Sequence, residues 1–363
     1  MLRSSLIRCL AALVAPAMLS GQGAPSLALQ PSNGSLAYDF KRLISVRELG
    51  DGRVLVSDRS SNRVLIGNFE IGVVDTIAPN DNPAAQFGLA GPLFALAGDS
   101  TLLADFDNRR WHFFRGARHV STVDARHPAV AAVPVLMGSD TLGHVLGRNF
   151  VRAVGADRSG DSASLVLAYR STSRVDTIAK LIPLTATSQS ALVNEVKRTS
   201  TLRVTLSERS ASEQAVLFPD GWVAIARLRP FRVDWREPDG RVTHGAHLAD
   251  NEPMLPASGS PGTQASNTTS ATDTPPFPGI SRRYVEAPNP ALFAAPDGRV
   301  LILRRVPSSS TTARYYVIDR SGSLRGVLVL DVREEIIGFG ARSVYVAVTS
   351  NRGTERLRRH PWP

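Results

Sequence analysis

The sequence predicts an all-β chain that closes into a six-bladed β-propeller, with four antiparallel strands in each blade. The main observation is a repeated phrase, in which an Asp-Gly turn is followed by an apolar, β-branched run. The phrase occurs at Glu48–Asp58, Phe218–Arg227 and Ala295–Arg304. Asp-Gly between apolar runs is a strong hairpin signal, and we expect type I′ turns, which need positive φ at both central residues. Several copies in one chain indicate a repeat architecture.

Short apolar runs and turn signals alternate from residue 43 onward and divide into six units. The first unit contains runs at Ile44–Leu49, Arg53–Ser57, Arg63–Asn68 and Val73–Ile77. The later units are expected at Leu93–Asp124, His144–Leu181, Gln214–Leu248, Ala291–Leu330 and Ile336–Leu357. A polar segment, residues 185–212, is expected to be an insertion before the fourth unit.

The last unit has only three clear strands, so we expect the segment Ser35–Phe40 to supply the fourth strand. A blade shared between the two ends of the chain is how a propeller closes. Closure removes the exposed sheet edges that an open array would leave. A pair of β-sandwiches is the alternative architecture.

The first 23 residues are typical of a secretory signal peptide. Arg3 and Arg8 accompany an apolar stretch at Leu10–Leu19, which is shorter than the roughly 20 residues that span a bilayer. Small residues between Ala17 and Ala24 indicate cleavage there, and an uncleaved anchor is the alternative. We therefore expect a secreted or periplasmic protein whose mature chain has no transmembrane segment.

The domain organisation expected from these signals is a signal peptide at 1–23 and a propeller at 35–363. A low-complexity stretch of Pro, Ser, Thr, Gly and Ala at 253–278 has too little apolar surface to fold alone. It is expected to loop out between the fourth and fifth blades.

The cysteine content and the net charge limit the kinds of site and partner that we expect. Cys9, the only cysteine, lies in the expected signal peptide, so the mature chain would have no disulfide, catalytic thiolate or Cys-ligated zinc. The formal net charge is +10, and arginine carries almost all of the positive charge. A surface for anionic partners is one explanation, and a compositional bias toward arginine is the other. Aromatic residues are not interleaved with the arginines, so we expect no nucleic-acid partner.

Several phrases resemble the secreted six-bladed β-propellers of bacteria, which are broadly NHL-like or TolB-like. They are Phe218–Arg227, Phe231–Trp235 with Pro238–Gly240, and Pro275–Phe277 leading into Pro296–Val300. The resemblance covers roughly residues 35–360 and implies the fold. It says little about activity, because many such propellers are binding modules whereas some relatives are calcium-dependent lactonases.

A calcium-dependent hydrolase would need carboxylates and amides gathered at the central channel. The weak candidates for metal ligands are Asp58, Asp105, Asp107 and Asn149, with Asn108 beside them. The commonest role of such residues is instead to end strands and form Asx turns. No calcium-loop spacing, Gly-x-Ser-x-Gly elbow or phosphate-binding loop occurs, so no catalytic residue is assigned. We expect no cofactor, with calcium as the alternative.

The placement of arginine is the sharper functional signal. The connections between the second and third strands of a propeller blade lie on one face, and here they are rich in arginine. The candidate ligand-binding residues are Arg109, Arg110, Arg227, Arg229, Arg304 and Arg305. The turns expected on the opposite face contain Asp51, Asp99, Asp220, Asp239 and Asp297. We therefore expect one basic and one more acidic face, unless the aspartates serve only the turns and the arginines are merely solvated.

The planar guanidinium group binds carboxylates, phosphates and sulfates bidentately. The expected function is therefore an exported binding module whose basic face engages an anionic small molecule, a polysaccharide or an acidic protein surface. One alternative is a calcium-dependent hydrolase, similar to lactonases or esterases, at the central channel. Another is an assembly component that makes its contact through the 253–278 loop.

Overall fold

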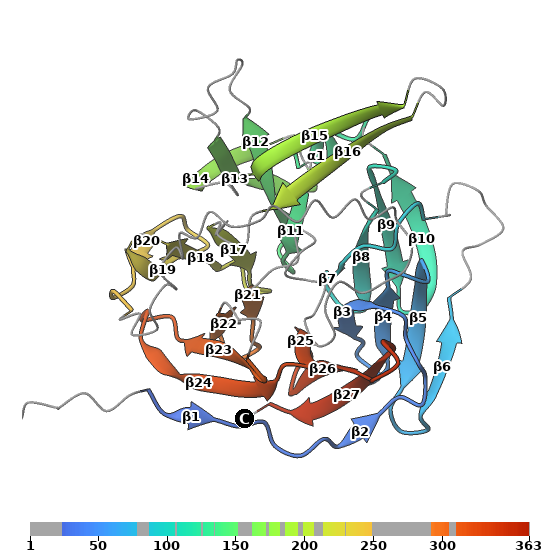
Figure 1. Ribbon diagram of the computed structural model, residues 1–363. Coiled ribbons are helices and arrows are strands. Elements are labelled where there is room, and N and C mark those ends of the chain that lie inside the picture. Colours follow the sequence, from blue (N-terminus) through green and yellow to red (C-terminus); the bar gives the residue numbers. More distant parts are fainter. Residues whose placement is uncertain are drawn as a thin grey trace, which may run out of the picture.

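The computed structural model shows six antiparallel sheets arranged as blades around a central axis (Figure 1). This confirms the predicted six-bladed propeller. The structure describes residues 24–77, 87–105, 107–124, 126–133, 135–151, 162–171, 174–181, 186–194, 199–206, 213–228, 230–248, 292–304 and 310–362.

The strands of each blade follow one another in sequence from the axis outward. Blade 1 contains β3 (Leu43–Glu48), β4 (Val54–Asp58), β5 (Arg63–Asn68) and β6 (Val73–Thr76). Blade 2 contains β7 (Leu93–Ala95), β8 (Ser100–Asp105), β9 (Arg110–Arg115) and β10 (Arg118–Val123). Blade 3 contains β11 (Val135–Ser139), β12 (His144–Val151), β13 (Ser162–Tyr169) and β14 (Val175–Leu181).

Blade 4 contains β17 (Gln214–Leu217), β18 (Val223–Leu228), β19 (Phe231–Arg236) and β20 (Val242–His244). Blade 5 contains β21 (Leu292–Ala294), β22 (Val300–Leu303), β23 (Thr312–Ile318) and β24 (Leu324–Asp331). Blade 6 contains β25 (Glu334–Phe339), β26 (Ser343–Thr349) and β27 (Glu355–Pro361). A separate hairpin of β15 (Ala186–Asn194) and β16 (Thr199–Leu206) lies within the predicted insertion.

The third blade begins earlier than the sequence analysis placed it. Its innermost strand is β11, whereas the prediction began the unit at His144. The segment before β11 forms a short helix, α1 (Pro128–Ala132), which the strand pattern did not predict. His127 caps this helix by accepting a hydrogen bond from the Ala129 N–H, and Pro128 occupies the first helical turn, where its missing N–H costs nothing.

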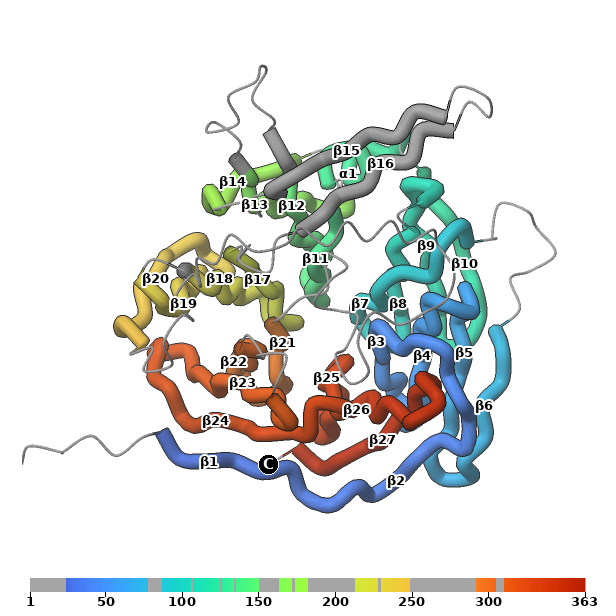
Figure 2. The backbone as a smooth tube through the Cα atoms, viewed as in Figure 1, coloured from blue at the N-terminus to red at the C-terminus, as the bar shows by residue number. Residues whose placement is uncertain are grey.

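The N-terminal segment closes the ring, as predicted. Strand β2 (Gly34–Ser35) pairs antiparallel with β27 as the fourth strand of blade 6, and Phe40 forms a bridge with Glu355. Upstream, β1 (Ser26–Leu27) adds a parallel fifth strand to β24 of blade 5. Figure 2 shows this blue segment running along the outer edges of the last two blades. The N-terminal strap, residues 25–40, therefore joins the first and last parts of the propeller.

The Asp-Gly turns differ from the predicted type I′ geometry. In the first turn the Gly52 N–H donates to Leu49 O, and the Leu49 N–H donates to Arg53 O. Only the glycine has positive φ, at 82°, whereas Asp51 does not. The same pattern recurs around Gly221 and Gly298. These loops contain three residues instead of two, so one left-handed glycine after the turn suffices to continue the strand.

The apolar core lies between successive blades. Because strand side chains alternate between the two faces of a sheet, each blade contributes to two junctions. Val54 and Val56 of β4 pack toward blade 6 and the N-terminal strap, whereas Leu55 packs toward blade 2. The buried residues of the described chain form six clusters, one at each junction between neighbouring blades.

The expected signal peptide (1–23) and the expected low-complexity loop (253–278) lie outside the described residues. Within the described part of the chain, no helix has the length and apolar character required to cross a membrane.

Candidate functional site

Two faces of the propeller differ in what they contain. The connection face, as we define it, carries the segments that follow the second strand of each blade and the segments that join successive blades. Asn62, in the connection after β4, shows that the two kinds of segment meet: its amide donates to Phe87 O at 3.1 Å and accepts from the Ala90 N–H at 2.7 Å. The turn face carries the Asp-Gly turns.

The repeat places three of the four predicted metal candidates and two of the predicted ligand-binding arginines at one equivalent position, whereas Asp107 lies two residues beyond it in blade 2. The strand registers align Val54, Thr101, Val145, Val223 and Val300. Four residues later, at the end of the second strand, stand Asp58, Asp105, Asn149, Arg227 and Arg304. This position therefore carries an acid in blades 1 and 2, an amide in blade 3 and an arginine in blades 4 and 5.

In blades 1 and 2 the acid at this position ties down the segment that enters the blade. The Asp58 carboxylate accepts from the Lys41 N–H at 2.9 Å and the Arg42 N–H at 2.8 Å. The Asp105 carboxylate accepts from the Gly88 N–H at 2.8 Å and the Leu89 N–H at 3.1 Å. Both carboxylates are buried. Their main role in the described structure is to bind backbone N–H groups of the entering segment. The local, Asx-type bonds considered from the sequence are also present, from the Ser61 N–H to Asp58 at 3.4 Å and from the Asn108 N–H to Asp105 at 3.3 Å.

Asp105 is followed, on its buried side, by two further polar side chains, His112 and Thr122. Burial alone would raise the pKa of this carboxyl, but the nearby His112 ring and hydrogen bonds from Gly88 and Asn108 together hold the pKa far below its usual range. His112 Nε2 lies 3.6 Å from Asp105 Oδ2, and His112 Nδ1 lies 2.9 Å from Thr122 Oγ1. Asp105 is therefore a fixed, ionised group in the wall of blade 2.

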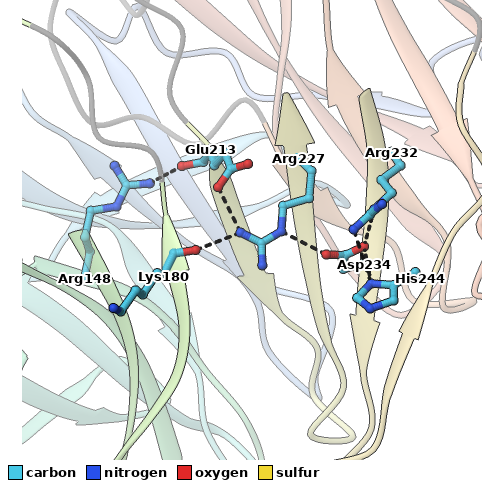
Figure 3. Close-up of polar contacts among 7 residues, drawn as sticks. All are labelled: Arg148, Lys180, Glu213, Arg227, Arg232, Asp234 and His244. Atoms are coloured by element: carbon cyan, nitrogen blue, oxygen red, sulfur yellow. Dashed lines mark hydrogen bonds and ion pairs between the residues drawn. The ribbon is translucent and has the colours of Figure 1, made fainter. Parts of the chain in front are cut away.

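Arg227 lies in a network of charged groups between blades 3 and 4 (Figure 3). Its guanidinium donates to Glu213 Oε2 at 2.9 Å, to Asp234 Oδ2 at 2.9 Å and to the Lys180 carbonyl at 2.8 Å. Burial alone would lower the pKa of Arg227, but the bonds to the two carboxylates outweigh it and raise the pKa. Arg227 is thus occupied by protein partners.

The acids of this network have further partners. Asp234 also accepts from Arg232 Nε at 2.7 Å and contacts His244 Nδ1 at 2.9 Å (Figure 3). Buried Arg148 donates to the backbone carbonyl of Glu213. Burial would raise the pKa of Asp234, whereas Arg232, His244 and Arg227 lower it. These bonds join blade 3 to blade 4, so the network has a structural role. His247, like the side chain of His244, is exposed.

The other five arginines that the sequence analysis named as ligand-binding candidates fall into three groups. Arg304 stacks against two rings, with its guanidinium carbon 4.5 Å from the Phe231 centroid and 4.9 Å from the Tyr316 centroid. Arg229 and Arg305 lie outside the described residues. Arg109 and Arg110 line a cleft on the connection face between blades 2 and 3.

The cleft is formed by the end of β8, the start of β9 and the segment that contains α1. It is shallow, with an enclosed volume of about 20 Å³, which is room for about one water molecule. The lining residues are Ala104, Asp105, Arg109, Arg110, Trp111, Val130, Val133 and Leu136. Arg109 is exposed and has a positive φ of 51°, which a turn between β8 and β9 imposes on it. Within the described part of the chain, neither arginine makes a side-chain hydrogen bond or an ion pair.

The turn face is less acidic than the sequence analysis expected. Asp51 forms an ion pair with Arg53, Asp297 pairs with Arg299, and Asp220 pairs with Arg320. Asp239 accepts from the Arg241 N–H, and Asp99 accepts from the Gly50 N–H. Asp51 and Asp297 are each neutralised by the arginine two positions later, and Asp220 is neutralised by Arg320 of blade 5. Counting the aspartates alone therefore overstated the acidity of this face.

The four predicted metal candidates do not come together as one set of calcium ligands. Asp58 and Asp105 already accept several N–H bonds, and such donors would face a cation with the same sign of charge. Asp107 and Asn149 are exposed. Among the described residues, no group of three or more His, Cys, Asp or Glu side chains could hold a metal ion.

The chain is similar in fold to several solved propellers. Regucalcin from Agrobacterium tumefaciens, a calcium-binding protein, is 10% identical with a TM-score of 0.46, over 94% of this chain and 97% of that chain. Virginiamycin B lyase from Staphylococcus aureus is 8% identical with a TM-score of 0.42, over 91% and 98%. A luciferin-regenerating enzyme is 9% identical with a TM-score of 0.41, over 91% and 92%. These values are too low to carry an inference about activity. No protein-family profile and no curated protein sequence matches the chain.

Sequence reasoning found the arginines of the cleft but missed its opposite wall. That wall comes from Val130 and Val133, in and beside α1, and from Leu136 of β11. A local signal was available, because Pro128 and Pro134 bracket a run of alanine and valine, and a proline commonly begins a helix. The strand-based division into units left this segment between blades without a structure.

Proposed function

We propose that this protein is an exported, non-catalytic binding module that holds an anionic ligand in the cleft between blades 2 and 3. Arg109 and Arg110 are the anion-binding residues. The observation that carries the proposal is the contrast among the predicted arginines of the described chain. Arg227 and Arg304 are engaged by carboxylates or rings, whereas Arg109 and Arg110 line a cleft and have no such partner.

The electrostatics of blade 2 support this assignment. The charge of Arg110 acts on the carboxylate of Asp124. The pKa of Asp124 is lowered first by the Arg126 N–H, then by the Arg126 side chain, and least by Arg110. Arg126 Nη2 lies 3.1 Å from the Asp124 carboxylate. Because Asp124 is already bonded, Arg110 remains free to bind an anion from solution. Two guanidinium groups at adjacent positions can supply charge-assisted hydrogen bonds to one oxyanion.

The test is thermal unfolding of the purified protein with acetate, sulfate or phosphate, at an ionic strength held constant with sodium chloride. A ligand at a hundredfold excess over its dissociation constant stabilises the folded state by about 2.7 kcal/mol. We expect at least one of these anions to raise the Tm of the wild-type protein. The double variant Arg109→Ala/Arg110→Ala should lose the shift.

The matched control is Arg115→Ala/Arg118→Ala. These two arginines belong to the same blade and are exposed, but they lie at the turn between β9 and β10 on the turn face. The control removes the same charge and should keep the shift. If both double variants lose the shift equally, the effect is one of net charge and the cleft is not the site.

A further inference from the structure

The connection face of blades 6, 1 and 2 carries a row of cations that continues from the cleft. We call this row the basic arc, and it consists of Lys41, Arg59, Arg63, Arg109, Arg110 and Arg352. We propose that the basic arc binds an extended acidic polysaccharide, with the two arginines of the cleft at one end and Arg352 at the other. This inference rests on the proposed function, because it names the ligand of which the cleft binds one carboxylate.

Backbone contacts join blades 6 and 1 on this face. The turn of blade 6 that contains Arg352 ends at Glu355. Glu355 forms a bridge with Phe40, which is the neighbour of Lys41. The carbonyl of the residue after Lys41 accepts from the Arg59 N–H at 2.9 Å. The segments that carry the cations of blade 6 and blade 1 therefore form one surface.

Blade 1 is joined to blade 2 in a similar way. Asn62, which precedes Arg63, donates its side-chain amide to Gly88 O at 3.3 Å. The Gly88 N–H donates to Asp105 at 2.8 Å. Asp105 lies directly opposite Arg110 in the antiparallel pair of β8 and β9. The basic arc therefore extends across three successive blades.

The cations of the basic arc are available to a ligand. Among the described residues, none of their side chains makes a hydrogen bond, an ion pair or a ring contact. Four are exposed and two, Arg59 and Arg110, are half-buried. In blades 3 to 5, by contrast, Arg148, Arg227 and Arg304 are bound to carbonyls, carboxylates or rings. An anion from solution therefore meets free cations on blades 6, 1 and 2.

Blades 1 and 2 present their cations with the same local geometry. Arg63 lies directly opposite Asp58 in blade 1, and Arg110 lies directly opposite Asp105 in blade 2. The residue before each of these arginines has a positive φ, which is 52° in blade 1 and 51° in blade 2. A surface that repeats its cations from blade to blade suits a ligand that repeats its anions.

The acids near the basic arc do not cancel its charge. Asp58 and Asp105 are buried and accept backbone N–H bonds. Glu355 is half-buried and accepts from the Leu43 N–H at 2.5 Å, whereas Asp107 is exposed. Against these four acids, the six cations leave a formal excess of two positive charges. The groups that face solvent are mainly the cations.

The cleft itself does not hold a whole ligand. It has room for about one water molecule, and its apolar lining residues are at most 4% exposed. A single carboxylate can therefore meet Arg109 and Arg110 at the mouth, while the rest of the ligand lies on the surface outside. A ligand that continues toward blade 1 gains Arg59 and Arg63 as further partners.

The basic arc lacks the apolar groups that a protein partner uses. Protein–protein interfaces are centred on buried aromatic or apolar anchors. In the described part of the chain, the exposed large apolar side chains lie on outer strands or on the turn face: Ile71, Val73, Val120, Leu142, Val175 and Val242. A polyuronate needs no such anchor, because each sugar carries a carboxylate and several weak bonds to one chain reinforce one another. The surface therefore favours an acidic polysaccharide over an acidic protein.

The experiment is isothermal titration of the purified protein with galacturonate and with its dimer, tetramer and octamer. A chelator removes calcium, and the ionic strength is held constant. We expect affinity to increase with length, so that the octamer binds at least about a hundredfold more tightly than galacturonate. The affinity of the octamer should fall steeply with added sodium chloride, because binding releases counterions. The methyl-esterified octamer, which lacks the charges, should not bind.

Variants of the arc outside the cleft test whether the ligand extends beyond blade 2. Arg59→Gln/Arg63→Gln should weaken octamer binding about tenfold, since each exposed ion pair contributes roughly two- to fivefold, and should leave galacturonate binding unchanged. Lys41→Gln/Arg352→Gln is the second variant, in case the first fails to fold, and the same loss is expected.

Two controls test the position of the charge and the class of the partner. Arg115→Gln/Arg118→Gln removes the same charge from the turn face and should change octamer affinity less than about twofold, because salt screens distant charges. Polyglutamate with the same number of carboxylates should bind about tenfold more weakly than the octamer. Its flexible side chains lose more conformational entropy on binding than the stiffer sugar chain does.

The outcomes separate this inference from the proposed function. If the octamer binds no more tightly than galacturonate, the extended ligand is wrong and anion binding at the cleft stands. If the variants of the arc and of the turn face weaken the octamer equally, the effect is one of net charge and the arc is not the site. If polyglutamate binds as tightly as the octamer, the partner is an acidic peptide. If Arg109→Ala/Arg110→Ala leaves the affinities of galacturonate and the octamer unchanged, the proposed function fails as well.

Discussion

Replacing Arg227 by methionine tests whether the charged network of Figure 3 holds blades 3 and 4 together. The substitution removes the hydrogen bonds to Glu213, Asp234 and the Lys180 carbonyl, and leaves two carboxylates that are 6% and 3% exposed. Removing one partner of a fully buried ion pair costs about 3–5 kcal/mol. Arg227 is itself 21% exposed, and Asp234 keeps Arg232, so the lower end applies. We expect a loss of about 3 kcal/mol of unfolding free energy.

The assay is urea unfolding followed by tryptophan fluorescence, with the Tm as a second readout. For a chain of this size a loss of about 3 kcal/mol corresponds to a fall in Tm of roughly 4 °C. Arg126→Met is the control, because it breaks an ion pair with Asp124 in which the arginine side chain is 93% exposed. Such an exposed pair contributes about 0–1 kcal/mol and weakens further in salt.

A double variant shows whether the loss comes from the pair. Adding Glu213→Gln to Arg227→Met removes the carboxylate that the first substitution deprives of its bond to Arg227, so the double variant should lose less than the sum of the single losses. If Arg227→Met is no more destabilising than Arg126→Met, the network does not stabilise the junction. Arg227 would then return as a candidate ligand-binding residue.

Three further predictions concern Asp105, the N-terminal strap and calcium. Because the folded-state pKa of Asp105 is depressed, this carboxylate stabilises the fold above its unfolded-state pKa of about 4, and the contribution is lost as the pH falls below that value. Asp105→Asn should therefore weaken the pH dependence of unfolding between pH 5 and 3, and an unchanged profile would contradict it. Leu36→Ala, which truncates a fully buried strap residue, should cost about 3 kcal/mol in urea unfolding, whereas Leu142→Ala, at an exposed position, should cost little. Thermal unfolding should be the same with calcium and with a chelator, and a calcium-dependent rise of several degrees would reveal a metal site among residues that the structure does not describe.

The fold could be predicted from the sequence because each blade repeats the same local signals. The turn glycines and the alternating apolar residues of β4, β18 and β22 fix strand position and the faces of each sheet. The blade boundaries were less accurate where a strand lacks this pattern. Val135–Ser139 contains a methionine and a glycine in place of a β-branched run, and so β11 was missed.

The candidate site could be predicted only in part, because burial and pairing are tertiary properties. Arg109, Arg227 and Arg304 all lie at or near the connection between the second and third strands of a blade, and the sequence does not distinguish an arginine at a cleft from one bound by Glu213 or stacked on Phe231. The distinction depends on residues from the neighbouring blade. The acidity of the turn face was overestimated for a similar reason, because pairing was not considered. Asp51 is neutralised by an arginine only two positions away in the same loop.

The most direct test of the account is a titration of the protein with acetate, followed through the assigned side-chain ¹⁵Nε–Hε signals of its arginines. The account predicts saturable shifts at Arg109 and Arg110 with a common dissociation constant, and unchanged signals at Arg227 and Arg304. Saturable shifts at Arg227 or Arg304 with none at Arg109 and Arg110 would contradict the assignment of the cleft, and so would the absence of any saturable shift.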